Sequence, residues 1–421
     1  MKVLVIGQGG REHALVKSLS RSTSVSEIHA IPGNDGMKRL AICHSIDLKN
    51  YDAVIQFCIA NEIEYVIIGP DEIVASPLAD LMRERGILVF APSQEASQLE
   101  SSKIFSKKFM FENEIPTAHF VEVESVEDVL NDYRQFQPPY VLKADGLAAG
   151  KGVYICQTVE ELKTAAEEVF LKKRFGNAGN KAIMEQFQTG WETSLHILTN
   201  GETYQILPTA QDHKRIFDND KGPNTGGMGT VAPLSLDAKL LATIEEKIVK
   251  KTLEGLSKKN FLYRGVLFIG LMITTDGPKV LEYNCRFGDP ETQVILPLIE
   301  GDVAEIFKAI TIGVVKPIKL KSLFTTCVIL ASPGYPDQPV TNQAILGDLE
   351  FESEFSYFIH AGTKKDPLSK EWVTAGGRVL GSIGIGQTKE ESINNAYKQS
   401  QHAFWEGKQQ RKDIGARFLK M

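Results

Sequence analysis

A carboxylate, an amide and a guanidinium alternate at the end of an apolar run, where residues 282–286 read EYNCR. Residues i and i+2 of a strand point to the same face, so Glu282 and Asn284 can reach one ion together. Their oxygen atoms suit Mg²⁺ that is bound jointly with substrate phosphates. Asp289 and Glu291 follow around a Gly-Asp-Pro turn. This density of charge favours a ligand-binding loop over a solvated turn.

A second candidate site is a lysine followed by a loop of small residues. Residues 143–152 read KADGLAAGKG, so Lys143 ends an apolar strand and Lys151 lies within the loop. Loops of Gly and Ala let the backbone approach phosphates closely and can close as a lid. The spacing does not match the phosphate-binding pattern GxxxxGK[ST]. A plain glycine-rich hairpin remains the alternative.

A third candidate is the glycine-rich turn near the N-terminus, where residues 7–13 read GQGGREH. Backbone N–H groups at the start of a helix attract phosphate, and Arg11 adds a positive charge. A dinucleotide-binding turn needs a sixth-position glycine, which is Glu12 here. The pattern therefore favours one phosphorylated small molecule over a dinucleotide. A tight strand-to-helix turn without a ligand is the alternative.

The segment 211–233, QDHKRIFDNDKGPNTGGMGTVAP, is polar and studded with glycine. It places two basic residues beside an acidic one and contains few apolar side chains. Such a segment cannot fill a core, and we interpret it as a loop that contacts substrates.

The composition is that of a soluble globular protein. The chain has 421 residues, of which 43% are hydrophobic and 24% charged, and a net charge of −6. At about 150 residues per domain this length predicts two to four domains. The mild acidity argues against nucleic acid or an anionic membrane as partner. Five scattered cysteines without metal-ligand spacing, and an N-terminus unlike a signal peptide, predict a cytoplasmic protein.

The pattern of apolar runs predicts three regions. Short strands at 2–6, 27–31, 65–68 and 87–90 alternate with helices, one of them spanning 73–85, and predict a parallel α/β domain. The central region mixes helices with hairpins at Asn200-Gly201 and Asp276-Gly277, which predicts an α+β domain. A third α+β region follows about residue 325 and ends in a helix at 390–404. Arg411 and Lys412 are interpreted as a solvated tail.

The combined motifs resemble the ATP-grasp ligases, and most closely the phosphoribosylamine–glycine ligase family. The resemblance rests on GQGGREHAL, LKADGLAAGKGV, QDHKR, GPNTGGMG, EYNCRFGDPETQ, HAGTK and TAGGRVL, and it spans nearly the whole chain. It implies a parallel α/β domain at 1–102, an ATP-grasp domain at 103–325 with a mobile lid at about 119–190, and a small α+β domain at 326–421.

The resemblance also implies a reaction and its cofactors. ATP would phosphorylate glycine, and the amine of 5-phosphoribosylamine would attack the glycyl phosphate, which is the second step of purine biosynthesis. The cofactors would be ATP and Mg²⁺ or Mn²⁺, and the protein would act as a monomer. Two alternatives remain open: another ATP-grasp carboxylate–amine ligase, and a non-catalytic ATP-binding module.

The family motifs assign roles to particular residues. Arg286, Asp212 and Lys214 would be catalytic, and Glu282 and Asn284 would hold the metal. ATP would contact Lys103, Lys143, Gly146, Gly150, Lys151, Gly152, Glu185, Phe187 and Glu192, the strand end 185–187 through its backbone and Glu192 through the ribose. The substrate residues would be Gly9, Gly10, Arg11, Asn224, Thr225, Gly226, Gly227 and Asp289. Two departures from the family pattern, Trp191 beside Glu192 and Asp71 after Gly-Pro, leave the details of these contacts open.

Overall fold

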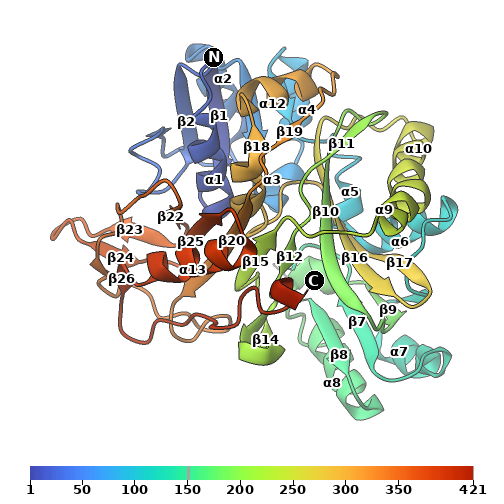
Figure 1. Cartoon of the computed structure of the whole chain (residues 1–421). Helices are drawn as coiled ribbons and strands as arrows, with labels where there is room; N and C mark the ends of the chain where they lie inside the picture. Colours follow the sequence, from blue (N-terminus) through green and yellow to red (C-terminus); the bar gives the residue numbers. More distant parts are fainter. Residues whose placement is uncertain (149–151, 421) are drawn as a thin grey trace.

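Within the residues that the computed structural model describes, 1–148 and 152–420, four sheets of four or five strands carry the fold (Figure 1). The first is parallel and the other three are antiparallel. The N-terminal parallel sheet, the central antiparallel sheets and the C-terminal sheet confirm the predicted multidomain α/β and α+β class. The predicted domain limits themselves stay predictions.

The N-terminal sheet has the order β3-β2-β1-β4-β5 and is parallel throughout. Its side chains alternate between two cores, since Val3 and Val5 pack in one cluster while Leu4 and Ile6 pack in another. Burial on both faces explains why these strands are continuous apolar runs. The elements are β1 Lys2–Gly7, α1 Gly10–Leu19, β2 Glu27–Pro32, β3 Ile42–Cys43, α2 Tyr51–Ala60, β4 Tyr65–Ile68, α3 Asp71–Val74, α4 Leu78–Glu84 and β5 Leu88–Phe90.

The single helix predicted at 73–85 is wrong, because two short helices, α3 and α4, occupy this stretch. Pro77 lies between them and has no N–H with which to continue the first helix. The chain turns there, and Ser76 Oγ donates to the carbonyl of Ile73, 2.7 Å away.

The large central sheet has the order β11-β10-β16-β17 and confirms both predicted hairpins. Its long strands cross the molecule beside helices α6 and α10 (Figure 1). The elements are α5 Gln98–Ser101, α6 Lys103–Glu112, β10 Trp191–Thr199, β11 Tyr204–Ile206, α9 Ala238–Ile244, a π-helical turn Glu245–Val249, α10 Lys250–Lys258, β16 Gly265–Thr274 and β17 Gly277–Asn284.

A smaller sheet, β6-β9-β7-β8, forms the lower right lobe of Figure 1 and has a hydrophobic core of its own. It contains the residues expected to form the lid, although Gly150 and Lys151 lie outside the described residues. The elements are β6 Phe120–Val123, α7 Val126–Asp132, a 3₁₀ turn Tyr133–Gln135, β7 Tyr140–Ala144, β8 Val153–Cys156, α8 Val159–Phe170, a 3₁₀ turn Gly176–Gly179 and β9 Ala182–Gln186.

The C-terminal sheet, β12-β15-β20-β25-β22, takes its first two strands from the polar segment 211–233. That segment is therefore anchored in the C-terminal part of the fold. The elements are β12 Gln211–Asp212, β15 Gly229–Ala232, α11 Thr292–Ile295, a 3₁₀ turn Leu296–Leu298, α12 Val303–Thr311, β20 Phe324–Ala331, β22 Ser356–His360, β25 Arg378–Gly386 and α13 Lys389–Ser400.

The helix predicted at 390–404 ends at Ser400, and residues 403–404 form a strand instead. Two-stranded ladders complete the fold, and one of them, β13-β14, lies within the polar segment. The remaining elements are β13 Arg215–Phe217, a 3₁₀ turn Asp218–Asp220, β14 Lys221–Asn224, β18 Ile299–Glu300, β19 Lys319–Leu320, β21 Leu346–Gly347, β23 Thr363–Lys365, β24 Trp372–Thr374, β26 Ala403–Phe404 and a 3₁₀ turn Phe418–Lys420.

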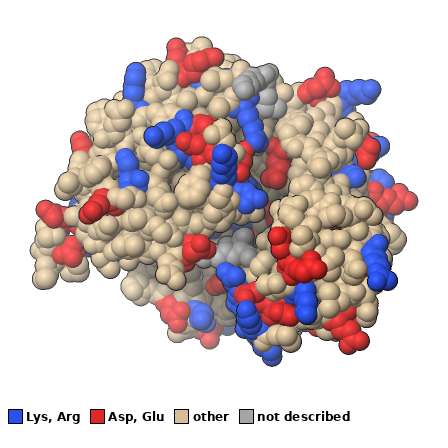
Figure 2. All heavy atoms as spheres, turned by 90° about the horizontal axis from the view of Figure 1, so that it is seen from below, with Lys and Arg blue, Asp and Glu red and all other residues tan. Residues whose placement is uncertain are grey.

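The surface matches the mild net charge. On the face seen in Figure 2, basic and acidic side chains are interspersed rather than gathered into one field of charge. Among the described residues, we find no helix with the length and apolar character needed to cross a bilayer.

Candidate active site

A cavity of about 370 Å³ lies where the central sheet, the small lobe and the C-terminal sheet meet. Charged side chains from distant parts of the chain line it. Those that the sequence singled out are Arg11, Lys103, Lys143, Lys214, Glu282, Asn284, Arg286 and Asp289, together with Gly152, Thr225 and Gly226. The convergence of these residues favours a phosphate-binding site, because phosphate groups bind where cations and backbone N–H groups gather.

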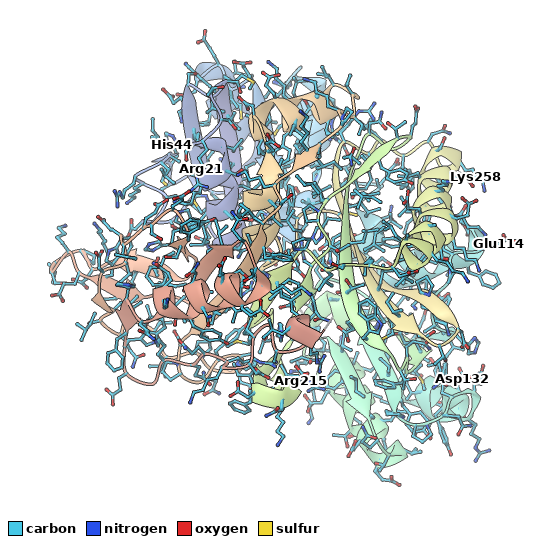
Figure 3. The ribbon with its side chains drawn as sticks, in the orientation of Figure 1. Arg21, His44, Glu114, Asp132, Arg215 and Lys258 are labelled. Carbon is cyan, nitrogen blue, oxygen red and sulfur yellow. The ribbon has the colours of Figure 1, made fainter. Side chains whose placement is uncertain are left out.

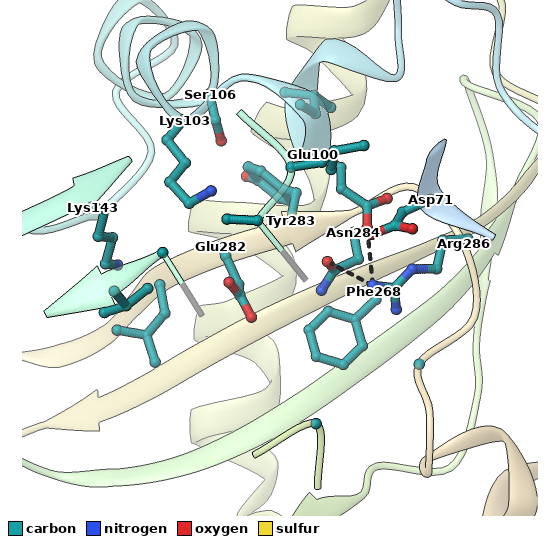
Figure 4. Close-up of a pocket in the computed structure, with 18 of the residues that line it drawn as sticks. Asp71, Glu100, Lys103, Ser106, Lys143, Phe268, Glu282, Tyr283, Asn284 and Arg286 are labelled. Atoms are coloured by element: carbon teal, nitrogen blue, oxygen red, sulfur yellow. Dashed lines mark hydrogen bonds and ion pairs between the residues drawn. The ribbon is translucent and has the colours of Figure 1, made fainter. Parts of the chain in front are cut away.

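Glu282 and Asn284 point into this cavity from β17, as their spacing predicts (Figure 4). Burial acts to raise the pKa of Glu282, but Lys214 and Lys143 hold it below the ordinary value. The carboxylate is thus ionised at neutral pH, as a metal ligand must be. Among the residues that the structure describes, no three His, Cys, Asp or Glu side chains form a complete metal site. One carboxylate and one amide fit Mg²⁺ only when phosphates and water supply the other ligands.

Lys103 opens helix α6 above the cavity, and its position depends on a local cap. Ser102 caps the helix by accepting a hydrogen bond from the backbone of Phe105 (3.0 Å), and its hydroxyl donates to Asp145 (3.0 Å). Asp145 also accepts from the backbone N–H of Ile104 (2.7 Å). This ties the helix to the glycine-rich loop, where Lys103 Nζ donates to the carbonyl of Gly146 (3.2 Å). Burial lowers the pKa of Lys103, which Glu282 partly offsets.

Glu185 lies behind the cavity wall and is the shared partner of two lysines. Lys143 on β7 pairs with one of its oxygens, and Lys107 Nζ lies 2.8 Å from the other. Only 5% of the Glu185 side chain is exposed. Burial acts to raise the pKa of Glu185, yet the two lysines hold it below the ordinary value. The Glu185 side chain therefore orients Lys143, which is a role that the sequence analysis did not assign to it.

Arg286 is held at the other end of the cavity by a buried acid. Its guanidinium lies 3.0 Å from Glu100 and donates to the amide oxygen of Asn284 (3.3 Å), as the dashed lines in Figure 4 show. Glu100 also accepts from the backbone N–H of Cys285 (2.7 Å). Asp71 adds a further negative charge facing Arg286. The Nε atom of this guanidinium has no hydrogen-bond partner among the described residues.

Asp212 and Lys214 form an ion pair next to the cavity, with Nζ and Oδ2 3.5 Å apart. Burial raises the pKa of Asp212 to about 7, with Lys214 opposing and Glu291 adding to the shift. Asp212, Lys214 and Glu291 line a smaller adjoining cavity of about 40 Å³, together with Glu192 and Glu282. This concentration of carboxylates around one lysine suits a small zwitterion whose ammonium group needs negative partners.

The loop after β14 wraps around this pair. Thr225 N–H and its hydroxyl both donate to the carbonyl of Lys214, each at 2.8 Å. Gly227 has φ +108°, and a Cβ there would come within 2.5 Å of Pro290 and 2.7 Å of Asp212. Only glycine fits such a position without strain. Asn224 lies on the exposed edge strand β14 and lines neither of the two cavities.

Gly9 and Gly10 line a neighbouring cavity of about 610 Å³, which the N-terminal sheet and the C-terminal region share. Asp289 and Arg378 lie at the boundary, since both line this cavity and the central one. Their side chains are 3.1 Å apart, and Arg378 donates to the carbonyl of Gly226 (2.6 Å). The two cavities therefore adjoin, which suits a reaction between two bound molecules.

Glu12 explains why the first turn lacks a sixth glycine. Its carboxylate accepts a hydrogen bond from the Gly9 N–H (2.7 Å) and lies 2.5 Å from Arg11 Nε. One backbone donor of the turn is thus already occupied by a buried acid. Arg11 extends to the carbonyl of Phe287 (3.2 Å) and lines the central cavity rather than the neighbouring one.

Several predicted site residues lie outside the central cavity. Gly146 and Phe187 are not among its lining residues, and Glu192 lines only the smaller adjoining one. The expected backbone contact of 185–187 with a nucleotide base therefore stays a prediction. No role was predicted for Glu100, Asp145 or Arg378, which are charged partners of predicted residues.

Three comparisons with known proteins match this chain along nearly its whole length. A curated relative from Caldanaerobacter subterraneus subsp. tengcongensis, phosphoribosylamine–glycine ligase, is 41% identical over 420 residues, covering 99% of this chain and all of the relative. The trifunctional purine biosynthetic protein adenosine-3 of Chironomus tentans is 38% identical over 98% of this chain and 31% of its own length. A crystal structure of phosphoribosylamine–glycine ligase from Thermotoga maritima aligns with a TM-score of 0.86 at 35% identity, covering 98% of this chain and all of that one.

The fold and the site together define an ATP-grasp ligase with an N-terminal parallel sheet and a C-terminal antiparallel sheet. Family models match each part: the N domain of phosphoribosylglycinamide synthetase at residues 1–100, its ATP-grasp (A) domain at 101–292 and its C domain at 325–417. The chain belongs to the phosphoribosylglycinamide synthetase family. The resemblance inferred from the motifs is confirmed.

Proposed function

We propose that this protein uses ATP to join glycine to 5-phosphoribosylamine, giving glycinamide ribonucleotide, ADP and phosphate. The observation that carries this proposal is the pair of adjoining cavities. The central one is lined by Lys103, Lys143 and Arg286 beside Glu282, and the neighbouring one begins at Asp289. One cavity has the charges for a nucleotide and an acyl phosphate, and the other has room for the phosphorylated amine.

The first half-reaction transfers the terminal phosphoryl group of ATP to the glycine carboxylate. Such transfers depend on positioning and on positive charge around the phosphoryl oxygens. Lys103 and Lys143 would hold the phosphates, and Arg286 would stabilise the charge on the transferred group. Glu282 and Asn284 would hold Mg²⁺ or Mn²⁺, which neutralises phosphate charge when it is bound.

Glycine would occupy the adjoining small cavity. Its ammonium group would face Asp212 and Glu291, and its carboxylate would face Lys214 and, from the adjoining central cavity, Arg286. This small cavity, of about 40 Å³, suits a compact amino acid. These features favour glycine over larger amino acids, and they disfavour the alternative that the protein ligates another carboxylate.

The second half-reaction is the attack of the 5-phosphoribosylamine nitrogen on the acyl carbon, which releases phosphate. Gly9 and Gly10 would line the phosphoribosyl site, where the start of α1 attracts phosphate through its remaining backbone N–H groups, while the Gly9 N–H stays bound to Glu12. Arg11 and Asp289 would contact it from the central side, and the loop 224–227 would close over the reacting centre. Closure excludes water, which would otherwise hydrolyse the acyl phosphate.

We also propose that the reaction takes place in the cytoplasm. All five cysteines are free, as expected for a protein of the reducing cytoplasm. We propose a monomer, because residues of one chain line both cavities.

The test is ADP release measured with ATP, Mg²⁺, glycine and freshly generated 5-phosphoribosylamine. Release should require both substrates, and alanine or serine should not replace glycine. The variant Lys103→Met should lose about 100-fold in kcat/KM for ATP. Lys108→Met is the matched control, because Lys108 lies on the same helix but is 53% exposed and pairs with Glu122. ADP release that is independent of glycine, or equal in both variants, would contradict the proposal.

A further inference from the structure

The C-terminal segment 409–418 packs against the polar segment that holds Asp212 and Lys214. In Figure 1 the red chain end lies beside β12 and β15, and Figure 3 places Arg215 in the same area. Arg411 lies at the centre of this contact, and only 1% of its side chain is exposed. The interpretation of Arg411 as part of a solvated tail is therefore wrong.

All three nitrogens of the Arg411 guanidinium are bound. Nε and one terminal nitrogen donate to the two oxygens of Asp413, at 2.7 and 2.8 Å. The other terminal nitrogen donates to Asp220 (2.9 Å) and to the backbone carbonyl of Arg215 (3.1 Å). A planar guanidinium matches such a fork of carboxylates, and an ammonium group does not.

Two further hydrogen bonds of this contact join a carboxylate to a backbone N–H group. Asp413 accepts from the N–H of Asn219 (2.8 Å), and Asp218 accepts from the N–H of Lys412 (2.7 Å). A carboxylate of the C-terminal segment thus accepts a hydrogen bond from the backbone of the β13-β14 hairpin, and a carboxylate of the hairpin accepts one from the backbone of the C-terminal segment.

The hairpin is strained at its turn. Asn219 and Asp220 have φ of +58° and +52°, and Gly222 follows at +79°. Residues other than glycine occupy this region only at a cost, so the surrounding structure must hold them there. Strand β14 is exposed along its whole length and contributes little packing. The hydrogen bonds of Arg411, Asp413 and Asp218 fix the hairpin in this strained conformation.

The base of the same hairpin carries site residues. The N–H of Thr225 donates to the carbonyl of Lys214, and the N–H of Met228 donates to the carbonyl of His213, each at 2.8 Å. His213 is buried and accepts at Nε2 from the N–H of Gly415 (3.4 Å), while its Nδ1 lies 3.0 Å from the carbonyl of Gly229. The C-terminal segment therefore contacts both ends of the stretch that contains Lys214.

We propose that Arg411 is a positioning residue for the ligase reaction. It fixes the β13-β14 hairpin, and through the hairpin it fixes Lys214 and Thr225 at the cavity. Arg411 itself touches neither cavity, since it lines neither of them. The inference rests on the proposed function for its kinetic consequences, whereas the hold on the hairpin follows from the contacts alone.

Two variants of Arg411 and one variant of the neighbouring Lys412 test this role. Arg411→Met removes the charge, Arg411→Lys keeps the charge but loses the fork, and Lys412→Met is the control, because among the described residues Lys412 contacts this hairpin through its backbone N–H. Displacement of a positioned group by about 1 Å lowers turnover by about 100-fold. We expect kcat/KM for glycine to fall by about 10- to 100-fold in Arg411→Lys and more in Arg411→Met. KM for ATP should stay within about twofold, because Lys103 and Lys143 lie on other elements.

A second kinetic readout separates positioning from general damage. A displaced loop would admit water to the acyl phosphate, so that water attacks the acyl carbon, phosphate leaves and glycine is regenerated. The ratio of ADP to glycinamide ribonucleotide should rise above one in both Arg411 variants and stay at one in Lys412→Met. Equal losses for glycine and ATP, or an unchanged ratio in a folded Arg411→Lys protein, would overturn the positioning role.

Amide hydrogen exchange provides a test that needs no substrate. Residues 213–228 should exchange faster in Arg411→Lys than in the wild-type protein or in Lys412→Met, while β7 and β17 stay unchanged. If Arg411→Met does not fold, the Lys variant decides the question. Unchanged exchange at 213–228 refutes the hold on the hairpin. Faster exchange in Arg411→Lys, combined with a wild-type protein that shows no ligase activity, would refute the proposed function and leave the contact between Arg411 and the hairpin intact.

Discussion

Replacing Glu185 by glutamine should reveal how much the fold depends on one buried acid. The change removes a negative charge from between Lys107 and Lys143 and keeps the shape of the side chain. All three side chains are at most 12% exposed. Glutamine can accept a hydrogen bond but cannot offset two charges, so two ammonium groups would face each other in a dry environment.

The size of the effect follows from this geometry. Removing one partner of a buried ion pair costs about 3–5 kcal/mol, because the remaining charge loses its compensation. The matched control is Glu122→Gln on the adjacent strand β6, where Glu122 pairs with Lys108 at the surface. An exposed pair contributes about 0–1 kcal/mol. The two variants should therefore differ by at least about 2 kcal/mol.

Urea unfolding followed by the fluorescence of an introduced probe in the small lobe would measure the difference, and ATP titration would measure the effect on Lys143. The pH dependence gives a further check. The pKa of Glu185 in the folded protein lies below its unfolded value. Its stabilisation is therefore present above the unfolded pKa and is lost as the pH falls through the folded one. In the glutamine variant this acid-sensitive part should be missing. Equal destabilisation by both variants would refute the assigned role of Glu185.

Two further predictions concern the segment around Asp212. The pKa of its carboxyl, raised to about 7, implies that kcat/KM for glycine falls about tenfold per pH unit below about 7, as the carboxyl takes up its proton and stops attracting an ammonium group. In Asp212→Asn this limb of the pH profile should disappear, and a profile with an unchanged limb would assign it to another group. Gly227→Ala should lower activity at least about tenfold, because the new methyl would meet Pro290 and Asp212. Gly277→Ala has a similar φ of +113° with nothing within 4 Å, so it should keep full activity.

The sequence predicts best those features that local pattern determines. Short apolar runs predicted the N-terminal strands, and two Gly-containing turns predicted both hairpins of the central region. Spacing on one strand was enough to bring Glu282 and Asn284 to the same cavity. Each of these conclusions depends on residues that are neighbours along the chain.

Partners far apart in sequence could not be found in this way. Arg286 pairs with Glu100, 186 positions earlier, and Arg378 pairs with Asp289. Arg411 illustrates the difficulty, because in a stretch that reads QQRKD nothing marks it as buried. Its partner Asp220 lies 191 residues away, and only the folded chain brings the two together.

The pairing of cations in the cavity has a consequence for how ATP binds. Four cations of the cavity each have a carboxylate partner: Lys143, Lys214, Arg286 and Arg378. Each partner fixes the orientation of its cation but also weakens the attraction of that cation for phosphate. Among the described residues, Lys103 has no carboxylate within 4.0 Å, and its ammonium group donates only to a backbone carbonyl. A neutral partner is displaced more readily than a charged one. Lys103 therefore has the charge that is most available to an incoming phosphate, and its loss should weaken ATP binding more than turnover of bound ATP.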